Sequence, residues 1–378
     1  MQKKGSHMLF TIPDYYKEFE CIADKCEDTC CAGWQIVIDP KSLKEYKAVT
    51  GSYKKTLLKK VNWLSRTFRQ NKEKRCAFLR EDNLCEMYRE LGEESLCRTC
   101  RLYPRHIEEF EGAREISLSV SCPEVARILM NRKTPVTFKT VETEKAENYE
   151  DFDDFFYSML LDVRDAMLKI LQNRQLPLDI REGLIYGIGR DIQRKVNHQE
   201  LFNCYSVLEK YKKKSAEDFV RNKVKHNRCH VAGQYMFYRS MFKRIQSLEL
   251  LKEDWFVLCR EVEHTLYESG DAFAYDDISV EFQEWVKAHY PDWEIQKEQL
   301  LVYFIFTYLC GAVYDGEILK KVQMALISVD MIEEIMKVRW LRNENYIDVE
   351  DVIEIGALER LLLYLPVNIL RWHCIEAF

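Results

Sequence analysis

The sequence lacks a membrane-spanning segment and a secretory signal. Its longest apolar run, LLVYFIFTYLCGAV from Leu300 to Val313, is shorter than the roughly 18–20 residues that a spanning helix needs. No positively charged leader with an apolar core follows the start of the chain. These absences predict a cytoplasmic protein without membrane contact, in which the apolar run forms a buried helix.

The opening MQKKGSHM resembles an expression remnant, so we expect the natural chain to begin near Met8. The sequence has 378 residues, of which 47% are apolar and 31% charged, and its formal net charge is −6. This length and composition predict an ordinary globular protein of two or three domains.

Histidine is scarce where cysteine is abundant. Nine of the fourteen cysteines fall within residues 21–122, and His106 is the one histidine of that stretch. The cytosol keeps thiols reduced, so dense cysteines there indicate a metal site more than disulfides. The predicted metal ligands are Cys21, Cys26, Cys30, Cys31, Cys76, Cys85, Cys97, Cys100 and Cys122. The scattered remainder are predicted to be core cysteines: Cys204, Cys229, Cys259, Cys310 and Cys374.

The spacing of the nine is C-x4-C-x3-C-C, then C-x8-C-x11-C-x2-C, then a lone cysteine. An all-thiolate set suits either structural zinc or an iron–sulfur cluster, and spacing does not separate the two. Nine buried cysteines acting as small apolar residues are the simpler alternative. Side chains of adjacent residues diverge, so Cys30 and Cys31 are not expected to serve one centre equally. One of them is then a ligand of a second site, a reserve thiol or a reactive group.

The expected fold is mostly α. We predict a small irregular cysteine-rich domain with a short β-hairpin at 8–132, a polar linker at 133–151 and an all-helical domain at 152–378. Apolar residues of the first predicted helix repeat every three or four positions: Phe152, Phe155, Phe156, Met159, Leu160, Val163 and Met167. Further helical stretches are expected near 178–196, 199–213, 231–248, 252–268, 279–289, 297–314, 317–338 and 348–364.

One hairpin stands out in the first domain. EISLSVSCPE alternates apolar residues with serines, and Glu111 and Gly112 can turn it back on the preceding RHIEEF. The strand would carry Cys122 at its end.

Residues 41–75 are strongly basic, with twelve Lys or Arg against Glu45 and Glu73. The favoured interpretation is the solvated face of one or two helices, with Leu57, Leu58, Val61, Trp63 and Leu64 turned inward. Docking of an acidic protein surface is the second interpretation. Nucleic-acid binding is disfavoured, because the rest of the chain is acidic and no reader motif accompanies the patch.

Three motifs carry a resemblance to a known family: FECIADKCEDTCCAGWQIVID (19–39), CAFLREDNLCEMYRELGEESLCRTCRLYPR (76–105) and EISLSVSCPEVARILM (115–130). In this order they resemble the flagellin lysine-N-methylase family and a wider group of cysteine-rich zinc- or iron-chelating proteins. The resemblance implies S-adenosylmethionine-dependent lysine methylation of flagellin, with a four-iron, four-sulfur (4Fe-4S) cluster held by the cysteines. It covers the first third closely and matches every predicted ligand except Cys97, where many members have serine.

The usual ways of binding the methyl donor are missing. GLIYGIGRD, Gly183 to Asp191, lies inside a helical pattern with no strand before it, so we interpret it as small residues at a helix contact. The radical-type signature C-x3-C-x2-C is absent, since Gly33 stands where its third cysteine would follow Cys26 and Cys30. The cluster is therefore the leading candidate for donor binding, through an iron that no protein thiolate occupies.

Other site residues are weaker candidates. Tyr103 and Arg105 can contact donor or substrate, although a buried tyrosine and a capping arginine explain them more simply. Trp34 is expected to pack over the thiols. The alternative function is a protein with a structural zinc or iron site and a helical interaction scaffold, or a metal-handling chelator.

Overall fold

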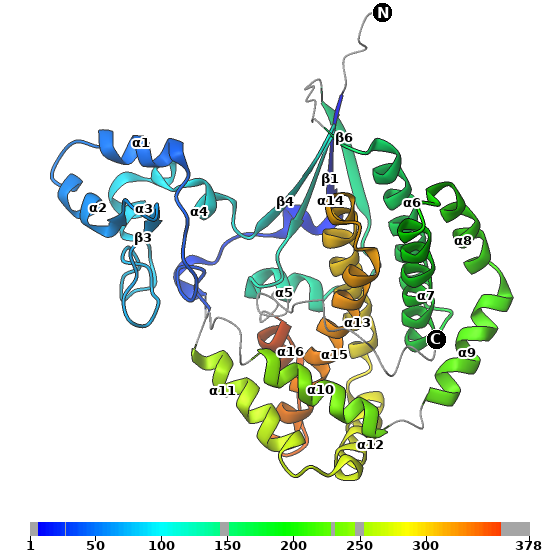
Figure 1. The fold of residues 1–378 in the computed structure, drawn as a ribbon. Helices are drawn as coiled ribbons and strands as arrows, with labels where there is room; N and C mark the ends of the chain where they lie inside the picture. The colour runs from blue at the N-terminus through cyan, green and yellow to red at the C-terminus, as the bar shows by residue number, and fades with distance from the viewer. Residues whose placement is uncertain (1–6, 27, 144–150, 228–230, 246–252, 357–378) are drawn as a thin grey trace, which may run out of the picture.

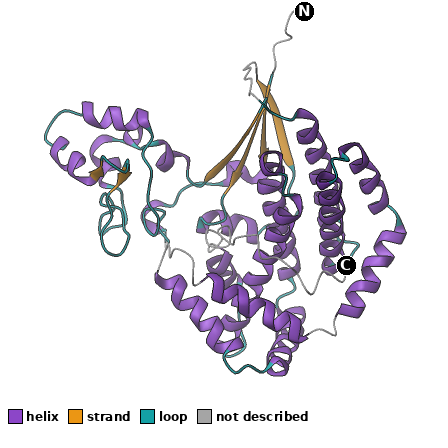
Figure 2. Cartoon of the chain, in the orientation of Figure 1, coloured by secondary structure: helices purple, strands orange, loops and turns teal. Residues whose placement is uncertain are grey.

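The computed structural model describes residues 7–26, 28–143, 151–227, 231–245 and 253–356. Figure 1 shows two parts: a small lobe at one side and a larger body of helices around a sheet. We call residues 30–102 the cysteine lobe and the other described residues, from β1 to α16, the body. The prediction of a mostly α fold is confirmed, and Figure 2 shows helices throughout both parts.

The cysteine lobe is built from short elements. They are α1 (Pro40–Ala48), α2 (Lys54–Lys60), β2 (Val61–Asn62), β3 (Thr67–Phe68), α3 (Glu86–Leu91) and α4 (Arg98–Leu102). Strands β2 and β3 pair in an antiparallel ribbon. A small core of its own closes the lobe, centred on Leu57, Val61, Phe68 and Phe78.

The predicted hairpin is confirmed. Strands β4 (Arg105–Phe110) and β5 (Ala113–Leu118) pair antiparallel, from Phe110 opposite Ala113 to Arg105 opposite Leu118. Gly112 has a φ of +67° at the turn, a conformation that glycine adopts without steric cost. The hairpin belongs to the body rather than to the cysteine lobe, because the apolar face of β5 is buried in the core of the body.

Two strands that the sequence pattern did not indicate complete the sheet. Strand β1 (Met8–Pro13) runs parallel to β5, and β6 (Phe138–Thr143) runs antiparallel to β1, giving the order β4-β5-β1-β6. The strand β6 lies inside the stretch expected to be linker. Backbone pairing with β1 orders this polar segment, which has no apolar periodicity to reveal it.

Most helices of the body follow the predicted stretches, but those at residues 123–130 and 214–227 lie outside all of them. Their bounds are α5 (Pro123–Met130), α6 (Asp154–Leu171), α7 (Leu178–Asn197), α8 (Cys204–Tyr211), α9 (Lys214–Asn227), α10 (Val231–Ile245), α11 (Glu253–Val262), α12 (Ala272–His289), α13 (Asp292–Tyr308), α14 (Ala312–Asp315), α15 (Ile318–Arg342) and α16 (Val349–Gly356). The predicted helix at 348–364 is described only to residue 356.

The core of the body joins segments from both predicted domains. Leu118, Val125 and Val136 share one buried cluster with residues of α6, α7, α13 and α15. The boundary between the two cores therefore lies near residue 103 and not at the predicted linker. The physical reason is that β5 and α5 have apolar faces which the body helices cover, whereas the lobe residues before them pack on one another.

The apolar run forms a buried helix, as predicted. Residues Leu300 to Phe306 on α13 are all buried, and the helix ends at Tyr308 before a short 3-10 turn, Leu309–Gly311. None of the described helices combines the length and apolar character required to span a membrane.

The glycines of GLIYGIGRD lie in helix α7 and mark helix contacts. A methyl group added at Gly187 would meet the Tyr211 hydroxyl at 2.5 Å, and one added at Gly189 would meet Val322 at 3.1 Å. These glycines let α8 and α15 approach α7 closely. The interpretation as a packing feature is therefore confirmed.

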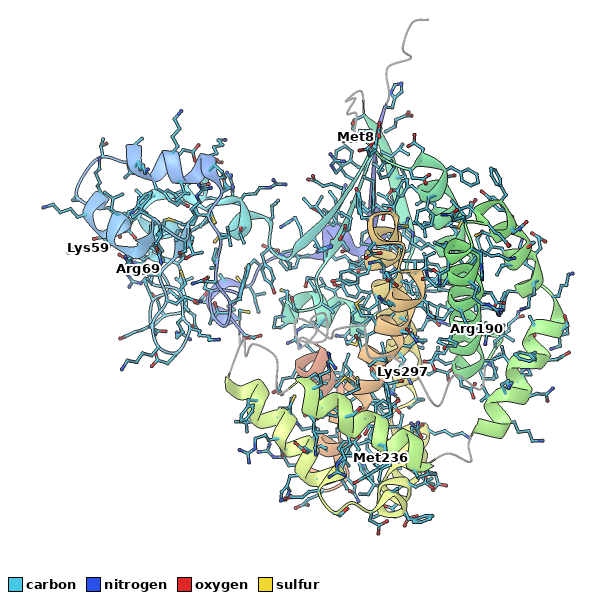
Figure 3. All side chains as sticks on the ribbon, in the orientation of Figure 1. Met8, Lys59, Arg69, Arg190, Met236 and Lys297 are labelled. Carbon is cyan, nitrogen blue, oxygen red and sulfur yellow. The ribbon has the colours of Figure 1, made fainter. Side chains whose placement is uncertain are left out.

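The basic stretch forms α1, α2 and the loops after them. Leu57 and Val61 are buried as predicted, but the prediction for Leu64 is wrong, because its side chain is 96% exposed. Leu64 follows β2 in the turn toward β3, where the chain reverses away from the core. Lys59 and Arg69 lie at the edge of the lobe away from the body (Figure 3). Phe155 on α6, predicted to face inward, is 38% exposed and lies against Phe202.

Candidate metal centre

Five of the nine predicted ligands gather in the core of the cysteine lobe: Cys31, Cys76, Cys85, Cys97 and Cys100. We call them the lobe group. The amide of Cys76 donates to the carbonyl of Cys31 at 2.8 Å, which brings two segments 45 residues apart side by side. Cys85 immediately precedes α3, and a backbone bridge with Leu79 holds it in place.

Cys97 and Cys100 form a close thiol pair. Cys97 immediately precedes α4 and Cys100 lies within it, and their Sγ atoms are 3.6 Å apart. Asp39, which immediately precedes α1, holds the start of α4 in place. Its carboxylate accepts hydrogen bonds from the backbone amides of Arg98 at 2.8 Å and Ser42 at 3.0 Å. The structure therefore places Cys97 among the other thiols, although it falls outside the family resemblance.

The thiols of the lobe group influence one another's protonation. A hydrogen bond with the Cys30 thiol lowers the pKa of Cys31 to about 7, against the opposing effect of burial. Burial raises the pKa of Cys76 to about 12, and the charges of Cys31, Cys85 and Cys97 add to that rise. The hydrogen bond between Cys97 and Cys100 lowers the pKa of Cys97 and raises that of Cys100. Metal binding requires thiolates, so a cation entering this group would displace protons from it.

Trp34 connects the Cys30 backbone to the contact between lobe and body. The indole of Trp34 donates to the carbonyl of Cys30 at 2.8 Å, and its ring lies 6.2 Å from that of Tyr103. Trp34 packs against the core of the lobe and Tyr103 against the core of the body. Trp34 thus packs beside the thiols, as predicted, at the contact between lobe and body.

Cys30 belongs to neither set, and the remaining three predicted ligands, Cys21, Cys26 and Cys122, lie outside the cysteine lobe. We call them the junction group. Cys122 is buried in the core of the body and immediately precedes α5, whose first residue is Pro123. Burial raises the pKa of Cys122, and the charges of Cys26 and Cys21 raise it further.

The segment before Cys21 explains this placement. Tyr15 is part of the core of the body, and Tyr16 and Phe19 pack against it. The Arg105 guanidinium lies over the rings of Tyr16 and Phe19, at 5.7 and 5.6 Å, and donates to the Tyr16 hydroxyl at 3.0 Å. Arg105 thus anchors the chain that leads to Cys21.

Tyr103 and His106 take part in side-chain contacts. The hydroxyls of Tyr103 and Ser121 are 3.4 Å apart, next to Cys122 in sequence. The His106 ring lies 2.7 Å from the Glu108 carboxylate on the same strand and 5.5 Å from the Tyr308 ring. His106 thus pairs with a carboxylate of its own strand.

The donor set fits a thiolate-bound metal or cluster in its chemistry. Across the described residues, no three His, Cys, Asp or Glu side chains are arranged to share one ion as they stand. The Cys97–Cys100 separation nevertheless approaches that of two ligands on one tetrahedral ion, about 3.8 Å for metal–sulfur bonds of about 2.3 Å. Cys204, Cys259 and Cys310 are buried in the core of the body, as predicted, while Cys229 and Cys374 lie outside the described residues.

The body also contains a cleft that the sequence did not reveal. Its volume is about 740 Å³, and helices α6 to α9 line it with residues that include Asp162, Asp165, Lys169 and Tyr205. Figure 1 places α8 and α9 at the side of the body away from the cysteine lobe. The cleft is therefore remote from the lobe group, and a ligand bound there would not contact those thiols.

Replacing Asp39 by alanine should loosen the Cys97–Cys100 turn. The loss of the helix cap is expected to lower the free energy of unfolding by about 1–2 kcal/mol at pH 7, measured by denaturant titration. Burial opposes ionisation of the carboxyl, but the amides of Arg98 and Ser42 outweigh it and lower the pKa of Asp39 to about 2.

Because the pKa of Asp39 is lowered in the folded protein, the loss of stability in Asp39→Ala depends on pH. Because the unfolded carboxyl titrates near 3.9, the stabilisation by Asp39 is fully present above pH 4 and is lost as pH falls toward 2. The difference between wild type and Asp39→Ala should therefore shrink over that range. Asp277→Ala, at an exposed position of α12, serves as the control and should stay within about 0.5 kcal/mol of wild type. A pH-independent difference for Asp39→Ala would contradict the assignment.

Comparison with known proteins gives consistent matches. Residues 164–357 match the family described as the FliB lysine N-methylase C-terminal domain. The flagellar biosynthetic protein FliU of Salmonella muenchen is 33% identical over 130 residues, 32% of this chain and 76% of that protein. A lysine-N-methylase of Salmonella typhimurium is also 33% identical over 130 residues, and this match covers 32% of each chain. No solved structure matches.

Proposed function

The chain belongs to the FliB lysine N-methylase family, and from that premise we propose that it methylates lysine side chains of flagellin, with S-adenosylmethionine as donor and a cysteine-held iron–sulfur cluster. Membership places the chain among lysine-methylating enzymes. The relative named as a flagellar biosynthetic protein supports a flagellar substrate. The observation that supports the cluster is the packing of five thiols, without histidine, in the core of the lobe, together with Cys122 buried in the core of the body.

The reaction requires an unprotonated lysine. The ε-amine forms a new N–C bond to the donor's methyl carbon with its lone pair, while the S–C bond breaks and its electron pair returns to sulfur. A lysine ammonium has a pKa near 10.4, so the site must desolvate it or supply a base before attack. The donor must also be held with its methyl group in line with the amine.

The chain offers thiols for the cluster and a helical body for the substrate. When bound, an iron–sulfur cluster with one iron free of protein thiolate would offer a ligation point for the amino and carboxylate groups of the donor. The residues that would hold it come from the nine thiols described above. The absence of a glycine-rich loop in the sequence supports this route, since GLIYGIGRD is part of helix α7.

The activity can be tested directly. Protein purified without oxygen is incubated with flagellin and methyl-labelled S-adenosylmethionine, and the lysines of flagellin are analysed by mass spectrometry. We expect label on lysine ε-nitrogens, together with iron and acid-labile sulfide in the enzyme. Titration with S-adenosylmethionine should change the spectrum of the cluster. Iron-loaded protein that transfers no label to flagellin would refute the proposed substrate or activity.

A second function is favoured by one distance. The 3.6 Å between the Cys97 and Cys100 thiols is typical of two ligands of a single tetrahedral ion. In this alternative the cysteines hold only a structural metal and the helices form an interaction scaffold. Zinc without labile sulfide, and no methyl transfer, would support it. Metal exchange without methyl transfer would instead indicate a metal-handling chelator.

A further inference from the structure

We propose that a basic surface of the cysteine lobe docks an acidic segment of the protein substrate. We call this surface the lobe patch and define it by six exposed cationic residues on α1, on α2 and in the loops around β3: Lys44, Lys55, Lys59, Arg66, Arg69 and Lys72. The segment that it binds would be rich in Asp and Glu. This inference rests on the proposed function for the role of the partner as a substrate, whereas the charge and exposure of the surface rest on the structure.

The lobe carries positive charge that its own carboxylates do not neutralise. Residues 30–102 contain sixteen Lys or Arg and nine Asp or Glu, a net charge of +7, so the rest of the chain carries −13. Some of these carboxylates already have partners: Glu86 pairs with Lys60, and Asp39 accepts from backbone amides. Within the part of the chain that the structure describes, no residue of the lobe patch forms an ion pair. Their charges are therefore available to the carboxylates of a partner.

The lobe patch is also open on the side away from the acidic body. Lys59 and Arg69 lie at that outer edge (Figure 3). The amide of Arg69 donates to the carbonyl of Lys60 at 2.8 Å, so the end of α2 and the residue after β3 are neighbours. Attraction between opposite charges extends over about 8 Å at physiological salt and speeds the encounter of two proteins. An acidic segment is thus drawn to the lobe rather than to the body.

The side chains between these cations favour a protein partner over a nucleic acid. Proteins hold single-stranded nucleic acid by stacking its bases on exposed aromatic rings. In this stretch Tyr46 and Phe68 are buried, and the Nζ of Lys47 lies 5.2 Å from the centre of the partly buried Trp63 ring. Leu64, which is 96% exposed, offers an apolar contact beside the charges instead. The negative charge of the rest of the chain would also repel a long polyphosphate.

The elements that carry the lobe patch also enclose the candidate metal centre. Leu57 of α2 and Phe68 of β3 belong to the same buried core as Cys76 and Cys97. A substrate held on the lobe patch is therefore brought to the part of the chain in which five of the predicted ligands pack. The lobe patch would select substrates by charge before any methyl transfer.

Peptide binding tests this inference separately from catalysis. The probe is a fluorescent peptide with several glutamates around one lysine and one leucine, and its matched control has glutamine in place of every glutamate. We expect wild-type protein to bind the acidic peptide at least about tenfold more tightly, as complementary charge requires, and binding to weaken as salt is raised. Equal affinity for the two peptides would overturn the inference.

Two triple variants remove the same charge from different places. The first changes three residues of the lobe patch: Lys55→Gln, Lys59→Gln and Arg69→Gln. The control changes three exposed lysines of the body: Lys139→Gln, Lys225→Gln and Lys287→Gln. The lobe variant should bind the acidic peptide about tenfold more weakly, because each exposed ion pair contributes about twofold to threefold. The control should stay within about twofold of wild type, because salt screens remote charges. Equal losses in both variants would contradict a local docking surface.

Labelling of wild-type protein keeps the test decisive even if a variant fails to fold. An amine-reactive reagent is applied with and without the acidic peptide, and modified lysines are counted by mass spectrometry. The peptide should protect Lys55 and Lys59 severalfold and leave Lys287 unprotected. Absence of this protection, or tighter binding of single-stranded DNA than of the acidic peptide, would overturn the inference. Peptide binding at the lobe patch without methyl transfer to flagellin would refute only the proposed function. Methyl transfer that the lobe variant leaves unchanged would refute this inference alone.

Discussion

Replacing Arg164 by methionine should lower the free energy of unfolding by about 3–5 kcal/mol, because it leaves a carboxylate buried without its cation. Arg164 on α6 donates through both terminal nitrogens to Glu115 on β5, with one N–O distance of 2.6 Å. The two side chains are 6% and 5% exposed. The guanidinium also donates to the Phe306 carbonyl at 3.3 Å and lies 4.8 Å from that ring. It thus ties the sheet to α6 and α13.

Denaturant unfolding with two comparison variants checks this expectation. Methionine keeps the length of the side chain, so the single variant removes mainly the charge and its hydrogen bonds. Replacing both partners, Glu115→Met/Arg164→Met, should recover part of the loss, since a buried ion pair can be exchanged for apolar residues at little cost. Arg342→Met removes a partner of Glu261 at 3.5 Å, in a pair whose arginine is 65% exposed, and should cost below about 1 kcal/mol. A double variant as unstable as the single one would contradict the argument.

Glu298→Gln should also cost about 3–5 kcal/mol, because two arginines depend on one buried carboxylate. Glu298 on α13 is fully buried and accepts from Arg174 at 2.9 Å and from Arg181 at 2.8 Å. Arg181 on α7 is itself buried, and it also donates to the Leu171 carbonyl at 2.6 Å. Glutamine preserves the shape but removes the negative charge, and its amide group presents hydrogens toward the guanidinium groups.

The chain provides a matched control for this second prediction. Glu294, on the same helix, accepts from Arg181 at 2.9 Å but is 58% exposed. Glu294→Gln should therefore change the free energy of unfolding by less than about 1 kcal/mol. Both variants are compared with wild type by denaturant titration at pH 7. Equal losses for Glu294→Gln and Glu298→Gln would show that burial of the carboxylate is not what makes it important.

Local patterns were enough to predict most of the helices, the hairpin and the list of clustered thiols. Apolar residues at every third or fourth position mark α6 and α7, because a helix packed on one side must bury one stripe. The alternation before Cys122 marks β5 in the same way. Strand β6 was not predicted because its order comes from pairing with β1, 125 to 135 residues away in sequence, which leaves no local signal.

The sequence by itself identified the nine clustered cysteines as candidate metal ligands, since thiols at short spacing in a histidine-poor segment are the chemistry of a thiolate centre. Only the tertiary structure decided how they group. Residues 21 and 31 are close in the chain, yet Phe19 packs on the body and Cys31 on the core of the lobe. Cys97, which the family resemblance left aside, lies 3.6 Å from Cys100. The reason is that spacing limits which thiols can meet, while burial of apolar side chains in two cores fixes which ones do.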